Sequence, residues 1–192
     1  MNKLNKNFYL SNDVVSISKS LIGKVLVTNI NQKLTSGIIT ETEAYAGITD
    51  KASHAYNNRR TLRTETMYCE GGVSYVYLCY GMHSLFNIVT NNKDIPHAVL
   101  IRAINPLDGI DIILERRGKN KITKDLCNGP GKITEALGIK TIHNNFSLLE
   151  NIIWIEDRNI NIDVSRIEIT PRIGIDYAGE DAKLPYRFLY NY

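Results

Sequence analysis

Cysteine is scarce in this sequence and follows no pairing pattern. The 192 residues include three cysteines, Cys69, Cys79 and Cys127, and no two of them have the spacing of zinc ligands. The odd number and the spacing argue against both a disulfide framework and a zinc site. Reduced thiols of this kind are typical of a cytosolic protein. We therefore expect a cytoplasmic protein that uses no metal and no other cofactor.

Long apolar runs are also absent. No segment has the unbroken apolar length of a membrane span, and residues 1–10 lack the apolar stretch of a signal peptide. The formal net charge is only +3, so the overall charge does not by itself indicate a polyanionic partner. With 43% apolar and 22% charged residues the composition is that of a globular protein, and we expect one domain over residues 1–192.

Tyrosine, in contrast, is abundant. The sequence has 11 tyrosines against 4 phenylalanines and 1 tryptophan. A tyrosine ring suits places where one edge stays hydrated, so a stacking surface is one interpretation. A bias toward AT-rich codons, which also increases Ile, Asn and Lys, explains the same count. The composition does not decide between the two.

The stretch from Ile38 to Tyr45 places carboxylates in a strand that is otherwise apolar. Its residues alternate with period two, which points one set of side chains to the same side: Ile39, Glu41, Glu43 and Tyr45. Burying a carboxylate is costly unless it is paired or hydrogen-bonded, so two on one face predict a polar cleft. The alternative is an edge strand whose solvated glutamates prevent pairing with other chains.

Other periodic segments predict a mixture of helices and strands. We expect helices from Ser11 to about Leu21, from Asn105-Pro106 to about Arg117, and from Ile133 to Leu137. Further strands are expected at Val25–Thr28, Ala98–Ile104, Ile152–Glu156 and Ile167–Thr170, and residues 187–190 close the chain. A turn over residues 29–33 joins the first of these strands to the glutamate-bearing strand as an antiparallel pair.

A long loop and a hairpin lie between these strands. The loop of residues 47–72 is slightly basic and either holds phosphates or is a solvated loop with incidental charge. The strands Val73–Tyr80 and Leu85–Val89 form a hairpin with residues 80–83 at its bend. Tyr80 at the tip either acts as a wedge or folds back on its own hairpin.

Several charged residues further along need a partner or a role. Arg102 interrupts an apolar strand and requires a carboxylate from a neighbouring strand. The basic run from Arg116 to Lys124 either contacts nucleic acid or is a solvated face. The segment Leu126–Lys132 lacks the glycine spacing of a Walker loop, although its glycines could hold a single phosphate through backbone amides.

Several of these blocks, taken in order, resemble one known family. They are Glu41–Tyr45, His54, Tyr75–Tyr77, Tyr80–Met82, Asn87, Leu100–Ala103, Asn128–Lys132, Arg172–Gly174 and Ala178–Glu180. The ordered set covers the chain from about Leu21 to Tyr190 and is similar to the alkyladenine (3-methyladenine) DNA glycosylases of the mammalian type. This resemblance implies a single α+β domain. Its curved, mostly antiparallel sheet has flanking helices and a protruding β-hairpin that wedges into DNA.

The resemblance also implies catalytic roles. Glu43 is the general base that activates water, and Arg102 holds that water together with a backbone carbonyl near Ile173. Strand geometry alone leaves Glu41 as an equal candidate, because it faces the same way as Glu43, and only the family pattern selects Glu43. Lys132 is the residue that could provide a Schiff-base nucleophile if water were not used.

The remaining roles concern the DNA. The walls of the implied base pocket are the rings of Tyr45, His54 and Tyr77. Asn87 forms its floor and excludes the exocyclic amine of guanine. Tyr80 is the wedge that fills the gap left in the duplex. Candidate phosphate contacts are Arg59, Arg60 and Lys132.

The implied activity is that of a monofunctional DNA glycosylase. It flips alkylated purines out of duplex DNA and hydrolyses the N-glycosidic bond, leaving an abasic site for base excision repair. The partner is then double-stranded DNA with damaged purines, and we expect a monomer in a bacterial-type cytosol, associated with the nucleoid. One alternative is a non-catalytic nucleic-acid-binding module of the same architecture. The other is a carbohydrate hydrolase using Glu41 and Glu43, but carboxylates two apart on one strand do not lie across a sugar from each other.

Overall fold

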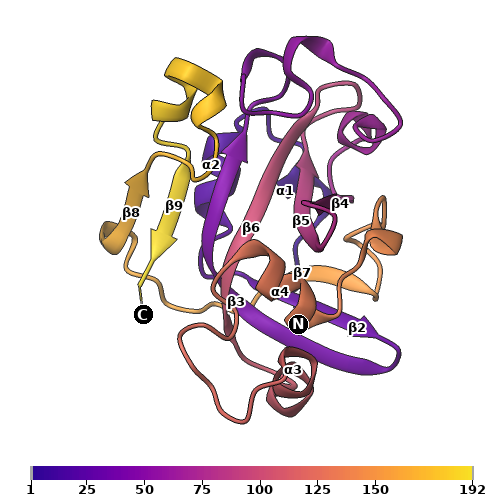
Figure 1. Cartoon of the computed structure of the whole chain (residues 1–192), viewed down its shortest axis with the longest axis vertical. Helices are drawn as coiled ribbons and strands as arrows, with labels where there is room; N and C mark the ends of the chain where they lie inside the picture. The colour runs from indigo at the N-terminus through magenta and orange to yellow at the C-terminus, as the bar shows by residue number, and fades with distance from the viewer. Residues whose placement is uncertain (1, 192) are drawn as a thin grey trace.

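One long strand, β3 (Lys33–Tyr45), organises the sheet (Figure 1). The computed structural model describes residues 2–191. Along one edge β3 pairs with β6 (His97–Pro106). Along the other edge its first half pairs with β2 (Val25–Ile30) and its second half with β9 (Arg187–Tyr190). The sheet therefore divides at β3, and it curls into a half-barrel.

The nine strands of residues 2–191 follow the order β1-β7-β2-β3-β6-β5-β4, with β8 attached to β9. All of their pairings are antiparallel. The strands not yet given are β1 (Asn2–Lys3), β4 (Ser74–Cys79), β5 (His83–Thr90), β7 (Ile153–Asp157) and β8 (Ile167–Thr170). The predicted α+β class with a curved antiparallel sheet is confirmed, and β4 and β5 form the predicted hairpin.

In the described part of the chain, four α-helices flank the sheet: α1 (Lys6–Tyr9), α2 (Val14–Ser20), α3 (Ile110–Arg117) and α4 (Pro130–Leu137). Figure 1 draws α1 and α2 behind the sheet and α4 in front of it. The main hydrophobic core includes buried side chains of α2, α3, α4 and the central strands. Short 3₁₀ helices occur at Gly47–Thr49, Tyr56–Asn58, Glu65–Tyr68, Thr141–His143, Val164–Arg166 and Asp176–Lys183.

A β-bulge in β3 decides which side chains face the site. The register with β6 shifts between Ile39 and Glu41. Ile39 is buried in the main core together with Ala44, whereas Glu41 and Glu43 both contact Arg102 on the other side. The expectation that Ile39 shares the face of the glutamates is therefore wrong, because the extra residue of a bulge interrupts the alternation.

Three helix starts also differ from the predicted ones. The cap of α2 is Asp13 rather than Ser11, since the Asp13 carboxylate accepts from the N–H of Ser16 at 3.0 Å. The helix expected from Asn105 starts only at Ile110, because β6 continues through Pro106 and the backbone turns at a left-handed Gly109 (φ 69°). The start of α4 lies three residues earlier than expected, with proline in its first turn.

Candidate active site

Glu43 is fully buried among groups that donate hydrogen bonds to it. Its Oε1 accepts from the backbone N–H of Ile173 at 2.8 Å, and its Oε2 accepts from the Tyr45 hydroxyl at 2.8 Å. The Nη1 of Arg102 lies 3.4 Å from Oε1. The strand β3 thus supplies the carboxylate and a tyrosine, β6 supplies the arginine, and the segment after β8 supplies the amide. The contact from this segment to Glu43 is the Ile173 N–H, and the carbonyl near Ile173 that the resemblance assigns to the water stays a prediction.

Glu41 is held by two arginines. Its Oε1 accepts from the Nε of Arg102 at 2.8 Å and from the Nε of Arg187 at 2.6 Å. The side chain is buried and does not line the cavity described below. Arg102 therefore bridges the two glutamates, and a second cation stabilises the charge on Glu41. Arg187 was not predicted as a partner, because it lies 146 residues away from Glu41.

Burial raises the pKa of Glu43 above its usual value, because an ionised carboxylate loses its hydration there. The charge of Arg102 and the hydrogen bonds from Ile173 and Tyr45 lower the pKa but offset only part of this rise, and the charge of Glu41 adds to it. A raised pKa makes the carboxylate a stronger base once it is ionised. Of the two glutamates, Glu43 has the environment of a proton acceptor.

The groups around Glu43 form part of the wall of a cavity of about 470 Å³. Aromatic side chains form much of the remaining wall. The ring centroids of His54 and Tyr77 lie 4.7 Å apart, and those of Tyr75 and Tyr77 lie 5.3 Å apart. Because Glu43 is itself unexposed, it lies directly behind this wall, next to three residues that line it: Tyr45, Arg102 and Ile173.

Tyr75 connects the walls of the cavity to its floor. Its hydroxyl is hydrogen-bonded to Nδ1 of His54 at 3.0 Å, and its backbone carbonyl accepts from Nδ2 of Asn87 at 3.1 Å. Burial lowers the pKa of His54 to about 4, and the charges of Arg63 and Arg59 add to the effect. His54 is therefore neutral at pH 7, so it does not repel a cationic base. Tyr75 had no predicted role of its own.

The hairpin of β4 and β5 brings Tyr80 to the mouth of the cavity. A turn of residues 80–82 joins Cys79 to His83, and Tyr80 has φ 50° and is 89% exposed. The ring therefore stands clear of its hairpin and does not fold back on it. Tyr177 and Ile173 are also exposed at this mouth. A rim of exposed apolar side chains around a cavity indicates a binding surface.

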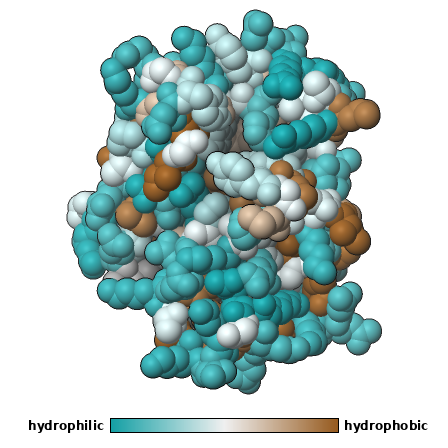
Figure 2. All heavy atoms as spheres, viewed as in Figure 1, coloured by the Kyte–Doolittle hydropathy of each residue, from teal (hydrophilic) through white to brown (hydrophobic). Residues whose placement is uncertain are grey.

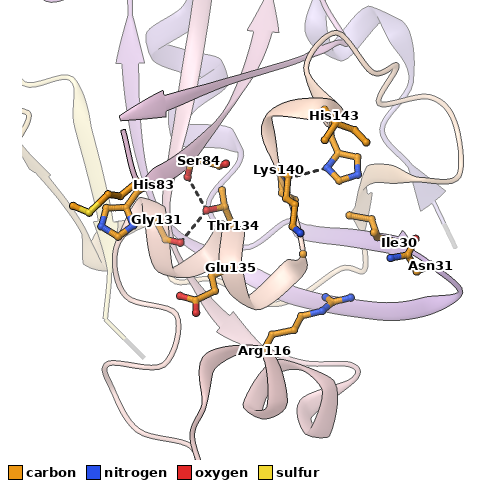
Figure 3. A pocket seen from close by; sticks show the side chains of 14 residues that line it. Ile30, Asn31, His83, Ser84, Arg116, Gly131, Thr134, Glu135, Lys140 and His143 are labelled. Carbon is orange, nitrogen blue, oxygen red and sulfur yellow. Dashed lines mark hydrogen bonds between the residues drawn. The ribbon is translucent and has the colours of Figure 1, made fainter. Parts of the chain in front are cut away.

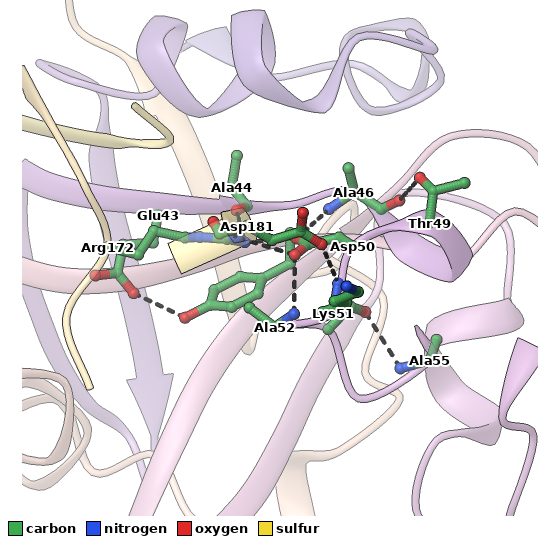
Figure 4. A network of polar contacts seen from close by, with 12 residues as sticks. Glu43, Ala44, Ala46, Thr49, Asp50, Lys51, Ala52, Ala55, Arg172 and Asp181 are labelled. Atoms are coloured by element: carbon green, nitrogen blue, oxygen red, sulfur yellow. Dashed lines mark hydrogen bonds and ion pairs between the residues drawn. The ribbon is translucent and has the colours of Figure 1, made fainter. Parts of the chain in front are cut away.

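A buried ion pair supports the wall beside Glu43 (Figure 4). Both carboxylate oxygens of Asp50 accept hydrogen bonds from the Arg172 guanidinium, at 2.5 and 2.9 Å, and one of them also accepts from the N–H of Ala46 at 3.0 Å. The guanidinium lies 4.8 Å from the centre of the Tyr45 ring. Since Arg172 immediately precedes Ile173, this pair fixes the segment that supplies the amide to Glu43.

The candidate phosphate contacts have different surroundings. Arg60 forms ion pairs with Glu65 at 2.6 Å and Asp94 at 2.7 Å. Lys132 is paired with Asp125 and does not line the cavity, so the geometry gives no support to a lysine nucleophile. Arg59 is exposed, and no carboxylate of residues 2–191 forms an ion pair with it. Arg63, which had no assigned role, lines the cavity and lies 5.1 Å from the centre of the Tyr77 ring.

A second cavity, of about 540 Å³, lies beside α4 (Figure 3). It is lined by the end of β2 and its turn, the start of β5 with the preceding turn, α3, α4 and the residues that follow α4. Its charged lining includes Arg116, Glu135 and Lys140, and it contains none of the residues of the glutamate site. Within residues 2–191 no three His, Cys, Asp or Glu side chains cluster as metal ligands. No helix in that range could cross a membrane.

Comparisons with known proteins show the family of this chain. Residues 7–192 match the model of a family described as methylpurine-DNA glycosylase (MPG). A Chlamydia felis protein named "Putative 3-methyladenine DNA glycosylase" is 52% identical over 189 residues, which cover 98% of this chain and 96% of the relative. A Clostridium novyi protein of the same name is 44% identical over 195 residues, covering 98% of this chain and 94% of that relative. The resemblance inferred from the sequence is thus confirmed, and the chain belongs to the methylpurine-DNA glycosylase family.

Proposed function

We propose that this chain hydrolyses the N-glycosidic bond of 3-methyladenine-type purines in duplex DNA and leaves an abasic site for base excision repair. Its family is one of DNA glycosylases, which are hydrolases of DNA repair. The observation that supports the proposal best is Glu43, buried with a raised pKa and bonded to Tyr45 and Ile173 behind a ring-walled cavity. A protein that only binds nucleic acid has no need of such a carboxylate.

The damaged nucleotide must leave the duplex before it can reach this cavity. Unstacking costs a few kcal/mol, and an apolar side chain inserted between base steps offsets part of that cost. The exposure of Tyr80 at the cavity mouth supports this role. Inside, each base–ring stacking contact contributes about 1–3 kcal/mol. The electron-rich faces of Tyr45 and Tyr77 favour a positively charged alkylated purine over a neutral one.

The chemical step uses water and Glu43. As the bond between the sugar and the base breaks, its electron pair leaves with the cationic base, which departs as a neutral molecule. Water then forms the new bond to the sugar carbon, and Glu43 takes its proton. The sugar resembles an oxocarbenium ion in the transition state, and the negative carboxylate stabilises that charge. Arg102, whose Nη1 lies 3.4 Å from Oε1 of Glu43, orients the carboxylate. Together with the backbone near Ile173 it also holds the water.

A glycosylase assay tests the proposal. The protein is incubated with duplex DNA that contains one 3-methyladenine or one hypoxanthine, and abasic sites are detected by alkaline cleavage. We expect abasic sites on at least one substrate and intact strands before alkali. Lesion binding without base release would instead support the non-catalytic module. Strand cleavage without alkali would indicate a lysine nucleophile and contradict hydrolysis.

We propose further that the enzyme acts in the cytosol as a monomer. Sedimentation with and without DNA would check the oligomeric state.

The rate of base release should fall as the pH decreases through the pKa of Glu43. The base must be ionised to accept a proton, and burial moves its pKa above 4.5, the usual value of a glutamate. His54 has a pKa of about 4 and titrates at lower pH. An Arg102→Met substitution removes the charge that opposes the rise, so the acid limb should move to still higher pH. Single-turnover rates from mildly acidic to neutral pH measure this, and a flat profile would contradict it.

Removing the Tyr80 ring should weaken lesion binding while the fold stays intact. A Tyr80→Ala substitution deletes an 89% exposed ring, so the unfolding free energy should hardly change. If the ring stacks in the duplex, its loss costs about 1–3 kcal/mol, which is about 5- to 150-fold in affinity for lesion DNA. Tyr80→Phe keeps the ring and is the matched control. Equal affinity of the alanine and phenylalanine variants, measured by fluorescence anisotropy, would remove Tyr80 from the DNA contact.

A further inference from the structure

The positive charge of this protein is concentrated in one segment. Residues 116–132 contain six Lys and Arg against one Asp, an excess of five positive charges. The whole chain carries only +3, so the remainder has a net charge of −2. Association with a polyanion depends on such local patches more than on the net charge. This segment is therefore where the electrostatic field of the molecule most favours a polyanion.

The middle of this segment is free to meet a partner. All eight residues from Gly118 to Asp125 are exposed. Lys121 and Lys124 form no ion pair within residues 2–191, whereas Lys132 is paired with Asp125 and Arg117 with Glu135. Over α3 and the residues that follow it, the surface in Figure 2 is mainly hydrophilic. Unpaired ammonium groups can neutralise phosphates without first breaking an internal ion pair.

The end of the segment is anchored at the catalytic site. The N–H of Gly129 donates to the backbone carbonyl of Arg102 at 2.9 Å, and Asn128 forms a β-bridge with Ala103. The next residue, Pro130, lines the base cavity. The basic segment is thus attached, through residues 128–130, to the same stretch of β6 that supplies Arg102.

We infer that residues 118–125 bind the phosphate backbone of the DNA arm that flanks the damaged nucleotide, and that Lys121 and Lys124 are its free contacts. This inference rests on the proposed function, because it takes duplex DNA as the substrate. The contact is made to phosphates and so carries no sequence or lesion information. It supplies affinity that decreases with salt, and it holds the duplex while Tyr80 and the cavity select the base.

The test is a Lys121→Ala/Lys124→Ala double substitution. Each phosphate contact that is lost lowers the slope of log affinity against log salt by about 0.9, so we expect a slope lower by about two and an affinity at low salt reduced at least about tenfold. The loss should be equal for lesion-containing and lesion-free duplexes. Single-turnover base release with saturating enzyme should stay at the wild-type rate, because neither lysine lines the cavity.

A control removes two positive charges elsewhere. Lys6→Ala/Lys19→Ala changes α1 and α2, which lie behind the sheet in Figure 1, and should leave the salt slope unchanged, although Lys6, unlike Lys121 and Lys124, is paired with a carboxylate, that of Glu70. A wild-type slope in the Lys121/Lys124 variant, or an equal drop in the control, would overturn the inference, because the effect would then be absent or due to net charge alone. Failure of the proposed function is distinguishable, because the wild-type protein would then release no base from the saturated complex.

Discussion

A Glu43→Gln substitution is expected to reduce base release by about 10²- to 10⁴-fold while lesion binding is kept. Glutamine has the same shape, and its amide oxygen can still accept a hydrogen bond from Ile173, but it cannot take a proton from water. Because Glu43 is unexposed and lies behind the cavity wall, the surface that contacts the base stays the same. Single-turnover release and fluorescence anisotropy on the same lesion duplex separate the two effects.

Glu41→Gln is the matched control for this experiment. It removes the same charge from the same cluster, and its amide oxygen can still accept from Arg102 and Arg187. We expect its rate of base release to remain within about tenfold of wild type, because Glu41 contacts two arginines, whereas only Glu43 also contacts Tyr45 and Ile173 in the cavity wall. If the loss occurs in Glu41→Gln instead, Glu41 is the base. If Glu43→Gln releases base at the wild-type rate, Glu43 has no part in the reaction.

The parts of the fold and site that follow from short stretches of sequence were predictable. Alternation within 73–80 and a glycine at the bend predict the hairpin, but they left open whether the Tyr80 ring folds back, and only the structure shows it exposed. An arginine in an apolar strand predicts a carboxylate partner, and the antiparallel pairing of β3 with β6 brings Glu41 and Glu43 to Arg102. These features need only local periodicity and one neighbouring strand.

The features that depend on distant contacts were not predictable. The partners Asp50 and Arg172 are 122 residues apart, and nothing in either local sequence indicates the other. The direction of the Glu43 pKa shift depends on how completely the surrounding segments exclude water, which the sequence does not show. The bulge beside Ile39 has no local signal either, since both of its flanks alternate like an ordinary strand. Pro106 predicted a helix start because proline suits a first turn, but β6 extends through it.

An Asp50→Ala substitution is expected to lower the free energy of unfolding by about 3–5 kcal/mol. Both side chains of the pair are almost unexposed. The substitution would therefore leave the Arg172 guanidinium buried without its main counter-charge, the Asp50 carboxylate. The loss of the acceptor for the N–H of Ala46 adds to the cost. Urea denaturation measures the change. Glu180→Ala, which removes one partner of a highly exposed ion pair with Lys183, is the control and should change stability little.

The double variant Asp50→Ala/Arg172→Leu separates the stabilising role of this pair from its role in the site. Without a guanidinium no charge is left unpaired, so stability should recover part of the way, although backbone N–H groups that bonded Asp50 stay unsatisfied. The rate of base release should not return to that of wild type. Arg172 also positions Ile173, whose N–H donates a hydrogen bond to Glu43, and it packs over the Tyr45 ring. Recovery of stability without activity shows that the pair positions the catalytic wall. If activity returns together with stability, the pair contributes only to folding.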